Sequence, residues 1–164
     1  MPDFESLLNR LIQGEVEFVI VGGFAAVAHG VSLPTQDIDV CCRFTPENLL
    51  RLQEALADLH PVHRMIPSRP PLQLTVETCA GLRNLYLDTD WGQLDCLGDI
   101  LGLGAYEDVV AHSISVELSG GRCRVLTIDA LIRAKEAMGR QRDREVALQL
   151  RAIRERWPTG PSHS

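Results

Sequence analysis

Hydrophobic and polar positions in the first quarter of the chain predict a helix, a buried strand, a short helix and a second strand. Apolar residues within positions 4–12 recur three and four places apart, which is typical of an amphipathic helix. The continuous and mostly β-branched run at residues 16–21 predicts a strand in the middle of a sheet. Gly22 and Gly23 follow it, then a helix-forming stretch at residues 24–28 that Gly30 would end, and an alternating strand at residues 36–42.

The rest of the chain continues to interleave helices, strands and turns. Thr45 and Pro46 are typical of a helix start, and Thr127 and Gly139 have the positions of a cap and a stop around another helix. Four prolines within residues 61–71 predict an exposed loop without regular structure and a place for a mobile flap. The remaining pattern predicts strands at 72–76, 84–87 and 92–97, a short helix at 105–112, a hairpin of 114–118 with 122–126, and helices at 128–138 and 143–157.

This order of elements predicts an α+β (α/β) fold in which helices cover one or both faces of a sheet. The chain has 164 residues, of which 45% are hydrophobic and 23% are charged, as in ordinary globular domains. We therefore expect a single domain over residues 1–157 and a disordered tail, PTGPSHS, at residues 158–164.

Charge and cysteine content narrow the classes of function. A net charge of −6 argues against a non-specific nucleic-acid binder, because such proteins carry a surplus of basic residues. The five cysteines form no C-x-x-C pair and lie in mostly apolar surroundings, which predicts buried, reduced thiols rather than catalytic cysteines. The N-terminus has no targeting pattern and no apolar run is long enough to span a bilayer, so we expect a cytoplasmic protein without membrane association.

Candidate chemistry is concentrated between residues 16 and 42. Glycines between a buried strand and a helix, here Gly22 and Gly23, let the backbone approach a phosphate closely. The strand period of two places Asp37 and Asp39 on one face, where two neighbouring carboxylates need a positive counter-charge. Mg²⁺ is the natural ion because it prefers oxygen ligands and is usually held by one or two carboxylates together with nucleotide phosphates. The alternative interpretation is a tight turn followed by a solvent-facing strand end.

The segment GGFAAVAHG followed by Thr35-Gln36-Asp37-Ile38-Asp39 resembles the nucleotidyltransferase superfamily typified by DNA polymerase β. It is most similar to the small bacterial branch that includes the abortive-infection toxin-like nucleotidyltransferases. The C-terminal segment LTIDALIRAKEAMGRQRD resembles the same branch, so the resemblance covers most of the chain. It implies a mixed sheet flanked by helices, with further helices at the C-terminus.

The resemblance also implies a role for each site residue. Gly22 and Gly23 would hold the β- and γ-phosphates, and Asp37 and Asp39 would coordinate two Mg²⁺ ions. A third acid on a neighbouring strand would complete the metal site, and the matching position is Asp95, in GQLDCL. The nearby Asp88 and Asp90 fall in a turn and are better interpreted as polar hairpin residues. Lys135, the single lysine among sixteen basic residues, would contact the nucleotide, with Arg133, Arg140, Arg142 and Asp143 as weaker candidates.

Two positions depart from the superfamily pattern. Many members have a serine where this chain has Gly23, and many have an arginine where it has Leu33. A hydroxyl and a cation near the site would therefore be absent, which bears on nucleotide affinity and substrate choice. His29 matches the H-G of the family, although a helix-end packing role explains it equally well.

The resemblance implies transfer of a nucleoside monophosphate from a nucleoside triphosphate to a hydroxyl acceptor, with release of pyrophosphate. We consider three acceptors: tRNA, which the arginine-rich residues 140–156 could bind, a protein, and an aminoglycoside-type small molecule. A toxin-like role with an antitoxin-like protein partner is implied by the resemblance alone. The alternative is a non-catalytic nucleotide- or partner-binding module of the same fold. A dinucleotide-dependent oxidoreductase is excluded, because no glycine fingerprint with its ribose-binding acid is present.

Overall fold

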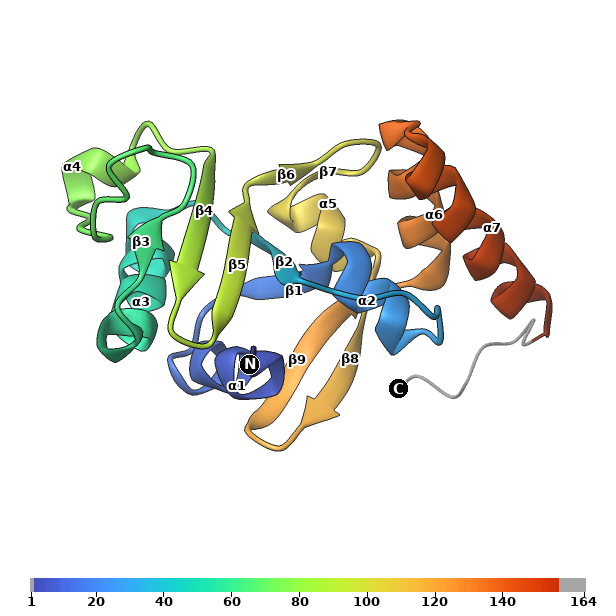
Figure 1. Cartoon of the computed structure of the whole chain (residues 1–164), viewed down its shortest axis with the longest axis horizontal. Helices are drawn as coiled ribbons and strands as arrows, with labels where there is room; N and C mark the ends of the chain where they lie inside the picture. The colour runs from blue at the N-terminus through green and yellow to red at the C-terminus, as the bar shows by residue number, and fades with distance from the viewer. Residues whose placement is uncertain (1, 157–164) are drawn as a thin grey trace.

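A computed structural model describes residues 2–156, which form a mixed sheet with helices around it (Figure 1). The seven-stranded sheet has the order β3-β4-β5-β2-β1-β9-β8. Its strands are β1 (Phe18–Val21), β2 (Asp37–Cys42), β3 (Val62–His63), β4 (Asn84–Thr89), β5 (Gly92–Leu97), β8 (Ser113–Leu118) and β9 (Gly121–Leu126). The β2–β5 and β1–β9 pairs are parallel and the other pairs are antiparallel, so the predicted fold class is confirmed. A separate two-stranded ribbon consists of β6 (Asp99–Ile100) and β7 (Gly104–Ala105).

The helices lie around this sheet (Figure 1). They are α1 (Phe4–Gln13), α2 (Gly22–Ala28), α3 (Pro46–Leu56), the 3₁₀ turn η1 (Ala57–Leu59), α4 (Val76–Cys79), α5 (Tyr106–Ala111), α6 (Ile128–Met138) and α7 (Gln141–Arg156). Helices α6 and α7 pack together at the opposite end of the molecule from α3 and α4 (Figure 1). The predicted caps are confirmed: the hydroxyls of Thr45 and Thr127 accept N–H bonds at the starts of α3 and α6, and Gly139 ends α6 with φ +71°.

The core is built from the apolar positions that the sequence pattern indicates. All four residues of β1 are buried, as expected for a strand with neighbours on both sides. On α1 the buried stripe consists of Leu7, Leu8 and Leu11. All five cysteines are buried free thiols, and burial raises the pKa of Cys41 to about 12, which makes this thiol unreactive.

Two predictions around the proline-rich loop are wrong. Residues 72–76 form no strand, because Thr75 caps α4 in a capping box with Thr78 and the backbone N–H of Leu74 bonds to the Gln53 side chain. Conversely, the loop predicted to lack regular structure contains β3, which pairs with β4. The sequence does not reveal this two-residue strand, because its partner β4 lies more than twenty residues away along the chain.

The helix predicted to end at residue 157 is described as far as Arg156, where α7 ends. Position 157 and the predicted tail at residues 158–164 lie outside the described residues. Among the helices of residues 2–156, none has the length and apolar character needed to cross a membrane.

Candidate active site

Three carboxylates converge on one face of the sheet. Strand β2 presents Asp37 and Asp39 on the same face because they are two residues apart, and the parallel register with β5 places Asp95 opposite Asp39. Each of the three acids offers one oxygen atom within 4.8 Å of the other two. The structure therefore brings together the three acids that the sequence places on two distant strands.

The environment of the two β2 acids opposes their ionisation. Burial raises the pKa of Asp39 to about 7, with further contributions from the charges of Asp37 and Asp95. The pKa of Asp37 is also raised, by burial and then by Asp95, while Arg64 and Arg142 act in the opposite direction. Three crowded oxygen ligands that need positive charge fit a hard divalent cation such as Mg²⁺.

Gly22 is required at the end of β1 for two geometric reasons. Its φ is +69°, which side-chain-bearing residues rarely adopt, and a Cβ atom there would lie 2.3 Å from Oδ2 of Asp39. At Gly23 a Cβ atom would lie 3.3 Å from the Thr35 methyl group, which is tight but can be accommodated by a small shift. The glycine turn therefore brings the backbone directly against one of the acids. The departure at Leu33 is explained by packing, because this side chain is half-buried against the core.

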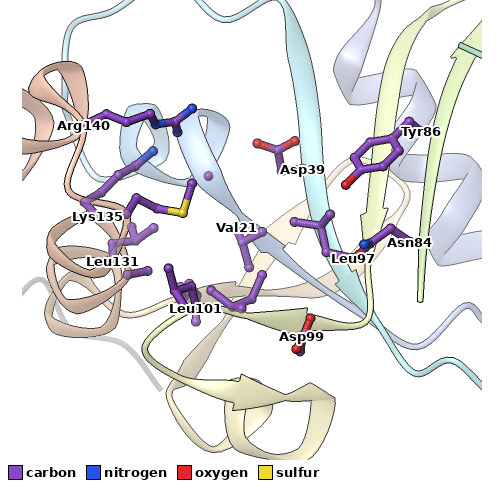
Figure 2. Close-up of a pocket in the computed structure, with 15 residues that line it drawn as sticks. Val21, Asp39, Asn84, Tyr86, Leu97, Asp99, Leu101, Leu131, Lys135 and Arg140 are labelled. Carbon is purple, nitrogen blue, oxygen red and sulfur yellow. The ribbon is translucent and has the colours of Figure 1, made fainter. Parts of the chain in front are cut away.

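A cavity of about 370 Å³ adjoins Asp39 and Gly22, whereas Asp37, Asp95 and Gly23 are not among its lining residues. In Figure 2, Lys135 and Arg140 project from the C-terminal helical region on one side, Tyr86 and Asn84 lie on the other, and Asp39 lies between them. The remaining lining is mainly apolar: Val21, Leu97, Ile100, Leu101, Leu126, Leu131, Ala134 and Met138, with Gly22 and Asp99. Gly22, Asp39 and Lys135, predicted from distant segments, thus share one cavity. The alternation of β4 could have indicated Asn84 and Tyr86, since Tyr86 pairs with Asp95.

A buried acid positions the two cations of this cavity. Asp143 is 1% exposed and accepts hydrogen bonds from Arg140 at 2.6 and 3.3 Å, while Nζ of Lys135 lies 3.5 Å away. Burial raises the pKa of Asp143, but the bonds and charges of Arg140 and Lys135 outweigh this effect and lower it overall. Asp143 is therefore ionised at neutral pH and fixes both cations near the cavity.

Sequence reasoning missed Arg64, which lies in the proline-rich loop just after β3. Its Nη1 donates to Oδ1 of Asp95 at 2.7 Å and its Nη2 donates to Oδ2 at 3.1 Å. Nη1 also donates to the carbonyl oxygen of Leu87 at 3.2 Å. No local motif marks this arginine, because its partner lies 31 residues away.

Several other sequence candidates have ordinary structural roles. Asp88 pairs with Arg69, and Asp90 pairs with His60, whose side chain is 80% exposed, as expected for polar hairpin and loop residues. His29 caps the C-terminal end of α2, and its Nε2 lies 2.7 Å from the carbonyl oxygen of Leu126.

Comparisons with known proteins agree with this architecture. No family model matches the chain, and no curated protein matches its sequence. Among solved structures, the lincosamide antibiotic adenylyltransferase LnuA in its lincomycin-bound form superposes with a TM-score of 0.60 at 14% identity, over 93% of this chain and 98% of that one. A candidate nucleotidyltransferase from Thermotoga maritima has a TM-score of 0.55 at 18% identity, over 89% and 88% of the two chains. The antibiotic-resistance factor ANT(2'')-Ia has a TM-score of 0.51 at 14% identity, over 95% and 91%. The chain therefore has the nucleotidyltransferase fold.

Proposed function

We propose that the protein is a Mg²⁺-dependent nucleotidyltransferase that moves a nucleoside monophosphate from a nucleoside triphosphate to a hydroxyl acceptor and releases pyrophosphate. The observation that carries this proposal is the convergence of Asp37, Asp39 and Asp95 beside the Gly22 turn. Such a constellation is costly for a protein that binds no cation, because burial and mutual repulsion raise the pKa of both β2 acids. This cost weighs against the non-catalytic module.

Each group of residues has a defined task in this proposal. Asp37, Asp39 and Asp95 would hold two Mg²⁺ ions, which when bound activate the attacking hydroxyl and neutralise the triphosphate. The backbone at Gly22 and Gly23 would receive the β- and γ-phosphates. Lys135 and Arg140, held by Asp143, would orient the phosphates from the opposite side of the cavity. The chain's own contribution is thus mainly the positioning of charge.

The apolar part of the cavity suits the nucleoside. Leu101 and Met138 are 60% and 46% exposed and line the same cavity as Lys135. Large apolar side chains at a cavity mouth lose exposed area when a flat base covers them, which is favourable. We therefore place the base against these residues and the triphosphate towards Gly22 and the acids.

The proposed acceptor is an alcohol, and the classes compared are tRNA, protein and small molecules. The arginines of α7 give limited support for tRNA, because Arg151 and Arg154 pair with Glu136 and Asp129, and Arg140 before the helix pairs with Asp143. The acidic net charge also disfavours a large nucleic-acid acceptor such as tRNA. LnuA and ANT(2'')-Ia are antibiotic-related proteins of the same fold, so small hydroxylated molecules are tested beside tRNA and protein. Transfer to tRNA would fit a toxin-like role with an antitoxin-like protein partner.

The test is transfer of label from each α-³²P-labelled nucleoside triphosphate in the presence of Mg²⁺. Three acceptor pools are compared: total tRNA, cell-lysate protein and a panel of aminoglycosides and lincosamides. We expect one pool to become labelled, and we expect EDTA or Asp39→Asn to abolish the labelling. Asp88→Asn is the matched control, because Asp88 is a carboxylate on neighbouring β4 that pairs with Arg69 outside the triad. Absence of label in every pool, with Mg²⁺-independent binding of ATP that Asp95→Asn does not change, would instead support the non-catalytic module.

A further inference from the structure

The third acid of the candidate metal site already has a cationic partner within the chain. Arg64 binds both carboxylate oxygens of Asp95 through two separate N–H groups, an arrangement that is stronger and more directional than a single contact. The pair is well shielded from solvent, since the two side chains are 18% and 11% exposed. Hydrogen bonding to Asp95 raises the pKa of Arg64, so the guanidinium is charged at every physiological pH.

The position of this cation matters because Asp95 also belongs to the triad. One of its oxygens lies within 4.8 Å of the ligand atoms of Asp37 and Asp39, so an ion bound there would be close to the guanidinium. A divalent ion and a guanidinium repel one another, and both attract the same carboxylate. Binding of the ion must therefore weaken the Arg64–Asp95 pair.

The surroundings of Arg64 allow its side chain to leave. Its backbone N–H donates to the Tyr86 carbonyl at 2.8 Å, which anchors the backbone to β4 independently of the side chain. The next two residues, Met65 and Ile66, are 68% and 44% exposed and are not part of the buried core. The negative charge of Asp88 already attracts Arg64, although Asp88 also pairs with Arg69. Asp88 can therefore receive the displaced guanidinium. Displacement of the guanidinium would therefore not disrupt the core.

We propose that Arg64 acts as an internal counter-cation, which holds Asp95 in the metal-free protein and competes with the divalent cation for its carboxylate. Arg64 thus sets the metal affinity of the site and is a positioning residue for Asp95. The inference rests on the proposed metal site, but it concerns a residue that the proposed reaction does not itself require.

The first test is titration of the purified full chain with Mn²⁺ alone, in which electron paramagnetic resonance measures the concentration of free Mn²⁺. Arg64→Gln is expected to bind Mn²⁺ about tenfold more tightly than wild type, as repulsion between a unit charge and a divalent ion a few ångströms away in a solvated site suggests. Arg122→Gln is the matched control, because it removes the same charge from β9, where Arg122 pairs with the exposed Glu117. Its Mn²⁺ affinity should stay within about twofold of wild type, as expected for an exposed pair.

A second measurement uses the wild-type chain, so that it decides the proposal even if Arg64→Gln fails to fold. Modification by p-hydroxyphenylglyoxal, followed by peptide mass spectrometry, reports how accessible each arginine is. Saturating Mn²⁺ should increase the reactivity of Arg64 several-fold and leave the reactivity of Arg122 unchanged.

The outcomes separate this inference from the proposed function. If wild type binds Mn²⁺ and transfers nucleotide, but Arg64→Gln binds Mn²⁺ no more tightly or Arg64 becomes no more reactive, the competition is wrong and the enzyme assignment stands. If neither wild type nor Arg64→Gln binds Mn²⁺, the metal site is wrong and both proposals fail.

Discussion

Asp39→Asn should stabilise the metal-free protein, and this gain should increase with pH. In wild type the pKa of Asp39 is raised from 3.8 to about 7, so the folded state holds a proton that the unfolded state has already lost. Wild type therefore loses stability as pH rises from about 4 to about 7, and the variant would be free of this loss because its amide does not titrate. From these two pKa values, the free energy of unfolding of the variant relative to wild type should increase by about 2 to 3 kcal/mol between pH 5 and pH 8.

The assay is urea denaturation in EDTA at pH 5 and pH 8, with Asp88→Asn as the control. A comparison across pH cancels any constant effect of the amide on packing. Added Mg²⁺ should stabilise wild type at pH 8 but not Asp39→Asn, because the variant lacks a ligand. A variant whose stability relative to wild type does not change between the two pH values would refute the claim that burial and the neighbouring carboxylates raise the pKa of Asp39.

Three further outcomes are expected. Gly22→Ala should lower the free energy of unfolding by about 2 kcal/mol or more and abolish Mn²⁺ binding, because its Cβ atom would lie 2.3 Å from Oδ2 of Asp39. Gly81→Ala is the control and should change neither property, because no atom lies within 4 Å of a Cβ at that position. Equal effects of the two substitutions would contradict the close approach of Gly22 to Asp39. Asp143→Asn should raise the KM for nucleoside triphosphate roughly tenfold with a smaller change in kcat, because Lys135 and Arg140 lose their charged partner. An unchanged KM would show that Asp143 does not position these two cations for the nucleotide. The five cysteine thiols, all of them buried, should react with Ellman's reagent only after unfolding in urea. Rapid reaction of the native protein would show that at least one of them is accessible.

Local patterns were sufficient to predict the elements that carry the β2 acids and the glycine turn. Strand β2 follows the period of two, and α6 begins and ends at the predicted Thr127 and Gly139. The match of Asp95 to the site came from the resemblance, and the parallel register of β2 with β5 places it opposite Asp39. The roles of these residues in nucleotide binding stay predictions.

The parts that could not be predicted depend on contacts between distant segments. β3 exists because β4 supplies its hydrogen bonds. The strand predicted at residues 72–76 does not form because Thr75 begins helix α4 with a capping box, a local signal that the apolar pattern obscured. Arg64 gave no signal because its side chain acquires a role only when β3 lies beside β4 and β5. The pairing of the α7 arginines with acids of α6 likewise could not be inferred from charge spacing along one helix.

In the proposed reaction Asp37, Asp39 and Asp95 hold divalent cations against a triphosphate lying at the Gly22 turn. The most direct measurement is anomalous diffraction from a crystal of the protein with Mn²⁺ and a non-hydrolysable nucleoside triphosphate analogue. We expect Mn²⁺ peaks about 2.0 to 2.2 Å from oxygens of all three acids, with phosphates beside Gly22 and Lys135. Mn²⁺ or nucleotide bound elsewhere, with the three carboxylates empty, would contradict it.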